Sequence, residues 1–133
     1  MYLLDTNVWI DIERGQQEKV IERFLAVLPG AVRLSTIVLG ELYVGAARSR
    51  DPDLARQTVN MLVSGFGLCE IDERAAHHYA EVTADLARRG KLIGTNDRWI
   101  AAQALAGDFV LVTANTGEFS RVKGLRCLDW RRG

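Results

Sequence analysis

Short apolar runs alternate along this chain with longer segments whose apolar residues recur at helical spacing, and this alternation limits the folds open to it. Apolar runs of this length are typical of buried strands, whereas recurrence every three or four residues is typical of helices that cover a sheet. Strands that alternate with helices predict an α/β fold, with a central parallel sheet of about five strands sandwiched by helices. The predicted strands end near residues 4, 35, 71, 113 and 128, and the predicted helices cover residues 8–13, 18–28, 37–48, 52–65, 73–89 and 96–106.

The composition is that of a single globular domain, which we expect to span residues 1–133. Hydrophobic residues make up 48% of the chain and charged residues 26%, which argues against intrinsic disorder. The formal net charge is zero, so there is no overall basic field of the kind that marks many nucleic-acid-binding proteins. No apolar stretch approaches the roughly 18 residues of a membrane span, and Asp5 interrupts the start where a signal peptide would continue. We therefore expect a cytoplasmic protein with no membrane partner.

Three carboxylates stand where the pattern calls for a turn residue or an apolar residue. Asp5 ends the first apolar run, and the carboxyl end of a strand in an open α/β sheet is where ligands bind. Glu41 and Asp97 fall within the apolar stripes of their predicted helices. Each has an ordinary alternative, since Asp5 or Asp97 could serve as a turn or capping residue and Glu41 could pair with Arg48 or Arg98. By residue type, Thr6 or Asn7 is the expected cap of the first helix, and Thr95 or Asn96 is the expected cap of the helix that carries Asp97.

Taken together, the three acids favour a metal site. All of them lie next to strand ends that share one edge in this sheet type. Two carboxylates about 4 Å apart repel by roughly 4 kcal/mol at an effective dielectric constant near 20, so three cannot all stay ionised without a cation or large pKa shifts. Oxygen ligands without a nearby His or Cys select Mg²⁺, for which Mn²⁺ could substitute. Asp5, Glu41 and Asp97 are therefore the predicted metal ligands.

A fourth polar group follows the predicted strand that ends at residue 113. This strand delivers Thr113 and Asn115 to the same edge as Asp5. Glu118 comes after a glycine turn and could add a further carboxylate, although a solvated Glu at the start of a helix is an equally good interpretation.

With these residues assembled, the chain resembles a PIN-domain ribonuclease, and most closely a VapC-type toxin of a bacterial toxin–antitoxin pair. The resemblance extends over nearly the whole chain in the order of the family, through the segments LLDTNVWI (3–10), STIVLGELYVGA (35–46), IGTNDRWIAAQAL (93–105) and LVTANTGEFSRVKGLRCLDW (111–130).

The resemblance implies roles for individual residues. Asp5, Glu41 and Asp97 match the three metal-binding acids of the family, and Glu118 matches a fourth acid that some relatives carry. Many relatives have Asp at the position of Asn115, which leaves open whether Glu118 or Asn115 completes the site. The polar neighbours that the resemblance places around these acids are Thr6, Asn7, Asn96, Thr113 and Asn115.

The resemblance also implies a function and partners. The family hydrolyses phosphodiester bonds in RNA, here expected to be tRNA, leaving a 5′-phosphate and a 3′-hydroxyl, and so inhibits translation and growth. Arg98, Arg121 and Lys123 could bind substrate phosphates, though each could equally be an ordinary solvated charge. The family further implies a homodimer packed partly through the helices of residues 37–66, a cognate VapB-type antitoxin, and operator DNA bound only through the antitoxin complex.

Two other classes compete with this interpretation. Phosphoryl-transfer domains also place acids at strand ends, but the haloacid-dehalogenase-like class needs a second Asp where Asn7 stands. A receiver domain wants a Lys after a late strand, where this chain has Thr113 and Ala114. A non-catalytic binding module, in which the acids are structural, is the other alternative.

Overall fold

A computed structural model of the chain, which describes residues 1–132, contains one five-stranded sheet in which every neighbouring pair of strands is parallel. The strand order is β3-β2-β1-β4-β5, so β1 lies at the centre. This arrangement confirms the predicted α/β fold with a parallel sheet of about five strands. The strands are β1 (Tyr2–Leu4), β2 (Val32–Ser35), β3 (Gly67–Cys69), β4 (Val110–Val112) and β5 (Cys127–Leu128).

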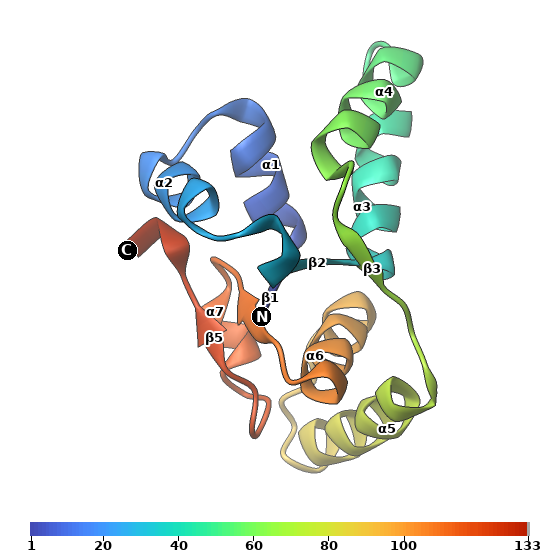
Figure 1. Cartoon of the computed structure of the whole chain (residues 1–133). Coiled ribbons are helices and arrows are strands. Elements are labelled where there is room, and N and C mark those ends of the chain that lie inside the picture. The colour runs from blue at the N-terminus through green and yellow to red at the C-terminus, as the bar shows by residue number, and fades with distance from the viewer. Residues whose placement is uncertain (133) are drawn as a thin grey trace.

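Helices connect the strands and cover the sheet. Figure 1 shows α1 and α2 on one side of the sheet and α5 and α6 on the other, while α3 and α4 extend together as a hairpin. The α-helices are α1 (Thr6–Arg14), α2 (Glu18–Ala26), α3 (Thr36–Ala47), α4 (Pro52–Val63), α5 (Glu73–Arg88), α6 (Thr95–Gly107) and α7 (Thr116–Phe119), and the 3-10 helices are η1 (Pro29–Ala31) and η2 (Trp130–Arg132). Within the described residues, no helix is both long and apolar enough to cross a membrane.

The core lies on both faces of the central strands. Leu3 and Leu4 of β1 are both fully buried, because a central strand of a parallel sheet is covered on each side. On the α6 side the sheet packs against Ile100, Ala101 and Ala104, which recur at helical spacing and are also fully buried.

The register of the strands brings three of their carboxyl ends together. Leu4 pairs with Val112, so the residues that follow, Asp5 and Thr113, are neighbours at the edge of the sheet. The backbone N–H of Asp5 donates to the carbonyl of Val112 at 2.9 Å. Ser35 ends β2 on the other side of β1 and caps α3.

The main departures from the predicted elements lie at helix ends. We expected Thr6 or Asn7 to cap the first helix, but Asp5 is the N-cap and its carboxylate accepts the N–H of Thr6. We also expected Thr95 or Asn96 to cap α6, whereas the N-cap is Gly94 without a side-chain hydrogen bond. The helix α7 was predicted as a polar turn, with a helix that starts at Glu118 as the alternative, because four residues are too few to show helical periodicity.

Candidate active site

Asp5 is the buried centre of the candidate site. The residue is 8% exposed, and each of its carboxylate oxygens accepts a hydrogen bond. The N–H of Thr6 donates to Oδ1 at 2.8 Å, and the fully buried hydroxyl of Thr113 donates to Oδ2 at 2.9 Å. The strand-end residues of β1 and β4 therefore fix the orientation of this carboxylate.

Glu41 reaches the same place from α3. The hydroxyl of Thr6 donates to its Oε1 at 2.8 Å, so Thr6 contacts Asp5 through its backbone and Glu41 through its side chain. Within residues 1–132, Glu41 makes no ion pair with Arg48 or Arg98, the partners that an ordinary structural role would have required. Thr6 thus links two of the predicted metal ligands.

Asp97 lies in the first turn of α6 and is half-buried. Burial raises its pKa to about 6, and the negative charges of Asp5, Glu41 and Glu118 contribute to this rise in that order of size. The carboxylates of four separate segments are therefore close enough to repel one another. The neighbouring residues Asn7 and Asn96 are exposed beside this group.

The segment after β4 brings in the fourth acid. The hydroxyl of Thr113 accepts the backbone N–H of Asn115 at 2.9 Å, and the side-chain amide of Asn115 donates to Glu118 Oε2 at 3.1 Å. A hydrogen-bonded series therefore runs from Asp5 through Thr113 and Asn115 to Glu118. Both residues that the sequence offered for the fourth position belong to one network.

The chemistry of this group suits a hard divalent cation. The atoms that could bind a metal are carboxylate, hydroxyl and amide oxygens, which are the ligands that Mg²⁺ and Mn²⁺ take. Among the described residues, however, no three His, Cys, Asp or Glu side chains are gathered tightly enough to hold an ion as they stand. Asp5, Glu41 and Glu118 are each held by a hydrogen-bond donor instead, so ion binding requires these side chains to draw inward.

The three predicted RNA-binding residues lie in different surroundings. The guanidinium of Arg98 donates to the hydroxyls of Thr83 and Thr95, at 3.3 and 3.0 Å, and lies 5.5 Å from the centre of the Tyr79 ring. Lys123 is exposed and forms an ion pair with Asp85, and the carbonyl of Arg121 accepts a hydrogen bond from Arg89. Their role in binding RNA stays a prediction.

Gln103 is a positioning residue that was not predicted from the sequence. It is buried in α6, where its Oε1 accepts the hydroxyl of Ser35 at 2.6 Å and its Nε2 donates to the carbonyl of Cys69 at 2.7 Å. Since Ser35 also caps α3, this side chain ties the helix that carries Asp97 to the helix that carries Glu41. An amide in the otherwise apolar stretch 100–106 was the signal that could have found it.

Comparison with known proteins places this chain among proteins of the same length. The family model described as PIN domain matches residues 2–125. A Shigella flexneri protein named tRNA(fMet)-specific endonuclease VapC is 36% identical over 129 residues, which cover 97% of each chain. Ribonuclease VapC2 of Haemophilus influenzae is 34% identical over 129 residues, again 97% of each chain.

Solved structures show the same fold. DNA-bound VapBC from Salmonella typhimurium contains a chain that is 35% identical, with a TM-score of 0.88 and 97% of both chains covered. VapBC-1 from nontypeable Haemophilus influenzae contains one that is 33% identical, with a TM-score of 0.87 and the same coverage. The likeness extends over nearly every element described above.

Proposed function

Because the chain belongs to the PIN domain family, we propose that it is an endoribonuclease that uses a divalent metal ion, like the VapC toxins it resembles. The observation that carries the proposal is the convergence of four carboxylates from separate segments, three of which help to raise the pKa of the fourth, Asp97, to about 6. A fold that only needed stability would gain nothing from this repulsion.

Asp5, Glu41 and Asp97 would hold the ion, with Glu118 or Asn115 completing the site. A bound Mg²⁺ or Mn²⁺ supplies a Lewis acid that neutralises charge on the phosphoryl oxygens and lowers the pKa of water. The protein's own part is to orient the ligands. Thr113 and the N–H of Thr6 orient Asp5, and the hydroxyl of Thr6 orients Glu41.

Asn115 performs the same task for Glu118 through a 3.1 Å hydrogen bond. In the absence of an ion, Asp97 holds a proton on about half of the molecules near pH 6, which relieves the repulsion among the acids. Hydrolysis would leave a 5′-phosphate and a 3′-hydroxyl on the RNA.

The proposed substrate is tRNA, including initiator tRNA, and its cleavage would inhibit translation and growth. The name of the Shigella flexneri relative, a tRNA(fMet)-specific endonuclease, supports this choice. Such a substrate also places the proposed activity in the cytoplasm. Arg98, Arg121 and Lys123 remain the predicted contacts to substrate phosphates.

We further propose a VapB-type antitoxin as partner, with operator DNA bound only through the complex of the two proteins. The VapBC structures, one of them bound to DNA, support this assignment. A groove of about 540 Å³ between α1, α3 and α4 opens beside Glu41. Exposed apolar side chains on α3 and α4, including Val44, Leu54 and Met61, offer surface for a partner and for the proposed homodimer.

The test is cleavage of tRNA by the purified protein, freed of any partner, with Mg²⁺ or with EDTA. The variants Asp5→Asn and Glu41→Gln are compared with matched changes at exposed acids outside the site, Asp53→Asn and Glu22→Gln. Discrete fragments with 5′-phosphates are expected from the wild type and both controls, and a loss of about 100-fold or more from each site variant. Cleavage that survives EDTA and both site substitutions would refute the proposed metal site. A wild-type protein that leaves every RNA intact would refute the proposal and favour a non-catalytic binding module.

A further inference from the structure

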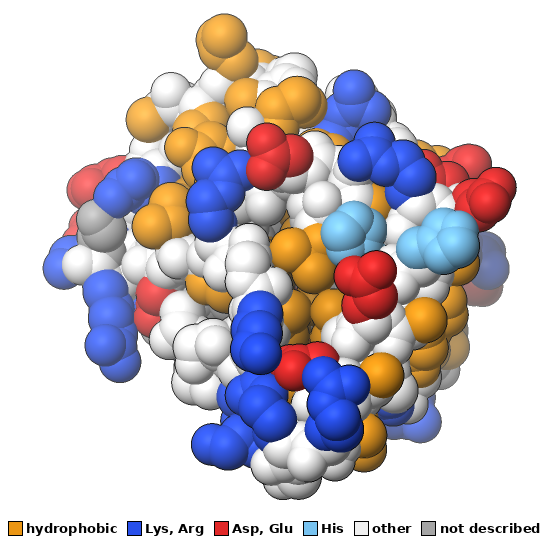
Figure 2. Space-filling view, turned by 90° about the horizontal axis from the view of Figure 1, so that it is seen from below, with side chains coloured by type: hydrophobic (Ala, Val, Ile, Leu, Met, Phe, Trp, Pro, Cys, Tyr) orange, Lys and Arg blue, Asp and Glu red, His pale blue; other side chains and the backbone are white. Residues whose placement is uncertain are grey.

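Outside the acidic site, three cations gather around one carboxylate. Asp85 on α5 forms ion pairs with Arg88 at 3.4 Å, Arg89 at 2.7 Å and Lys123 at 3.4 Å. Arg88 and Arg89 belong to the end of α5, whereas Lys123 comes from the segment after α7. Figure 2 shows Lys and Arg side chains gathered around an acidic side chain on this face of the molecule.

The charges of this cluster do not balance. The hydrogen bond from Arg89 and the charges of Arg89 and Lys123 hold the pKa of Asp85 below its usual range, so it stays ionised. Among the described residues, the one negative charge of Asp85 is paired with three positive ones, while the other carboxylate that lines the adjoining pocket, Glu81, makes no ion pair with them. Arg88 and Lys123 are 72% and 77% exposed, so most of their donors are open to a ligand, while Arg89 is largely engaged with Asp85 and the carbonyl of Arg121. The cluster is therefore suited to an anion.

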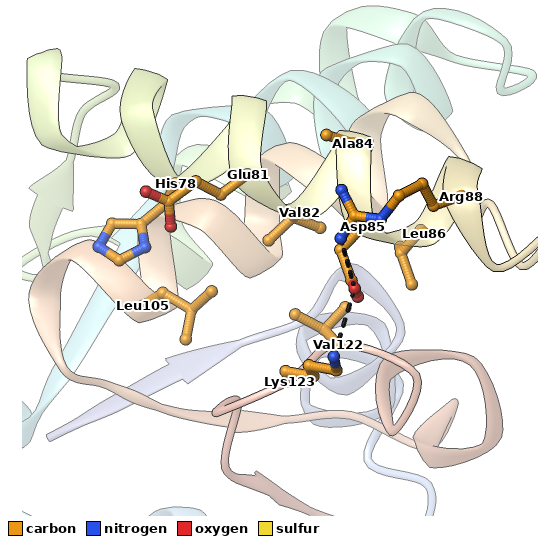
Figure 3. A pocket seen from close by; sticks show the side chains of 10 residues that line it. All are labelled: His78, Glu81, Val82, Ala84, Asp85, Leu86, Arg88, Leu105, Val122 and Lys123. Carbon is orange, nitrogen blue, oxygen red and sulfur yellow. Dashed lines mark hydrogen bonds and ion pairs between the residues drawn. The ribbon is translucent and has the colours of Figure 1, made fainter.

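A pocket of about 470 Å³ lies beside these cations. Figure 3 shows Arg88 and Lys123 at one end, and His78 with Glu81 at the other. Apolar side chains lie between the two ends, contributed by Val82, Leu86, Leu105 and Val122. The pocket thus combines a cationic end, an apolar floor and an end with hydrogen-bonding groups.

We propose that this pocket is a second RNA contact, in which Arg88 and Lys123 bind a backbone phosphate and the apolar floor receives an unpaired base. The inference rests on the proposed ribonuclease function, which supplies the RNA. Proteins that bind single-stranded segments combine cations along the backbone with aromatic rings or guanidinium planes on which splayed bases stack. Here aliphatic side chains form the floor, and His78 and Arg88 supply the planar groups. His78 and Glu81 are placed to hydrogen-bond the edge of such a base.

The pocket is connected to the segments that carry the acids. Arg89 donates to the carbonyl of Arg121 at 2.5 Å, and Arg121 follows Glu118 by only three residues. On the other side, α5 leads through a short loop into α6, which carries Asp97 in its first turn. The cationic end of the pocket is thus only a few residues along the chain from two segments that carry acids, and in the proposal one RNA molecule contacts both places.

The charge part of the proposal is tested by reversing the two exposed cations. In an Asp5→Asn background, the double variant Arg88→Glu/Lys123→Glu is compared with Lys19→Glu/Arg74→Glu, which has the same net charge at exposed positions. Arg74 lies on the same helix, about 21 Å from Arg88 along its axis. Binding is measured by fluorescence anisotropy on labelled tRNA and on a single-stranded RNA of about 12 nucleotides.

The expected readout is the salt dependence of binding to the single-stranded RNA. For Arg88→Glu/Lys123→Glu, the slope of log K against the logarithm of salt concentration should become shallower by about 0.7 for each phosphate that the protein no longer binds. Lys19→Glu/Arg74→Glu should keep the slope of the parent protein, because neither side chain lines the pocket.

The floor of the pocket is tested without a change in charge. Ala84 is exposed and lines the pocket, so Ala84→Trp fills it, whereas Ala87→Trp adds the same side chain to an exposed position of α5 that does not line it. We expect Ala84→Trp to weaken binding of the single-stranded RNA by about 5-fold or more, and to leave a duplex of equal length nearly unchanged. Ala87→Trp should bind both RNAs as the parent does.

The outcomes separate this inference from the proposed function. If the wild type cuts tRNA while the pocket variants bind RNA no more weakly than their controls, the inference fails and the ribonuclease proposal stands. If the wild type cuts no RNA but the pocket variants alone lose binding, the RNA contact stands and the ribonuclease proposal fails. A change in oligomeric state without a change in RNA binding would assign the pocket to a protein contact and overturn the inference.

Discussion

Replacing Asp97 by Asn is expected to stabilise the metal-free protein at neutral pH, although Asp97 is a proposed metal ligand. Burial and the charges of Asp5, Glu41 and Glu118 all oppose its ionisation, so the ionised side chain destabilises the folded state. Asn has nearly the same shape and carries no charge. Within residues 1–132, the Asp97 side chain accepts no hydrogen bond that the substitution would remove.

The magnitude follows from the pKa. It rises from 3.8 to about 6, and a difference of one in pKa corresponds to about 1.4 kcal/mol, so the full effect would be about 3 kcal/mol. Because the side chain is only half-buried, solvent screening reduces the expected gain to roughly 1–2 kcal/mol. For a chain of this length, that gain raises Tm by roughly 3–8 °C.

The effect has a definite pH dependence. Between pH 4 and pH 6 the folded state holds more protons on Asp97 than the unfolded state does, so the stability that this group contributes falls as the pH rises. Below pH 4 both states are protonated and the wild type and Asp97→Asn should converge. Above pH 6 the difference should reach its full size and stay constant.

The assay is urea unfolding at several pH values in EDTA, repeated with Mg²⁺. The exposed Asp53→Asn serves as the matched control and should change the free energy of unfolding by less than about 0.5 kcal/mol at every pH. Mg²⁺ should stabilise the wild type and not Asp97→Asn. A variant that is as stable as the wild type or less stable at pH 8 in EDTA would refute the electrostatic reasoning.

Substitutions at four further positions test hydrogen bonds and packing in the structure. Thr113→Val should cost about 1–3 kcal/mol in urea unfolding and reduce RNA cleavage, because it leaves Asp5 Oδ2 and the N–H of Asn115 unpaired, while Thr113→Ser should restore both. Gln103→Leu should cost about 1–3 kcal/mol in urea unfolding, because the hydroxyl of Ser35 and the carbonyl of Cys69 lose their hydrogen-bond partner. Unchanged stability would rule out a positioning role for Gln103. Gly107→Ala should destabilise the protein by about 1–3 kcal/mol, because the added Cβ would lie 2.2 Å from the Phe109 ring. Gly45→Ala should stabilise it by about 0.5–1 kcal/mol, because the added Cβ meets no atom within 4 Å and Ala favours the helix more than Gly does. Thermal melts measure both changes.

The sequence was informative where local pattern and position in the fold agree. Asp5 could be placed because an apolar run ends at it, and Glu41 and Asp97 because each interrupts an apolar stripe. These signals depend only on residues a few positions apart, and the rule that parallel strands end at one edge joined them. The parallel sheet followed from the same alternation of strands and helices.

The remaining features depend on contacts between distant segments. Nothing near Asp85 in the sequence reveals that Lys123, 38 residues later, pairs with it. The contact of Gln103 with Ser35 spans 68 residues. The capping role of Asp5 was considered only as an alternative, because Thr6 and Asn7 are equally good caps by residue type and only the backbone decides among the three.

The central claim is that carboxylates from separate segments act as one ion-binding site, and calorimetric titration of the protein with Mn²⁺ tests it most directly. Titrations in two buffers of different ionisation enthalpy give the number of protons that the protein releases when the ion binds. At pH 6 each bound ion should release about half a proton from Asp97, because the pKa of this side chain is about 6. At pH 8 the release should nearly vanish, and Asp97→Asn should release none at either pH. The absence of Mn²⁺ binding by the wild type, or proton release that persists in Asp97→Asn, would contradict the account.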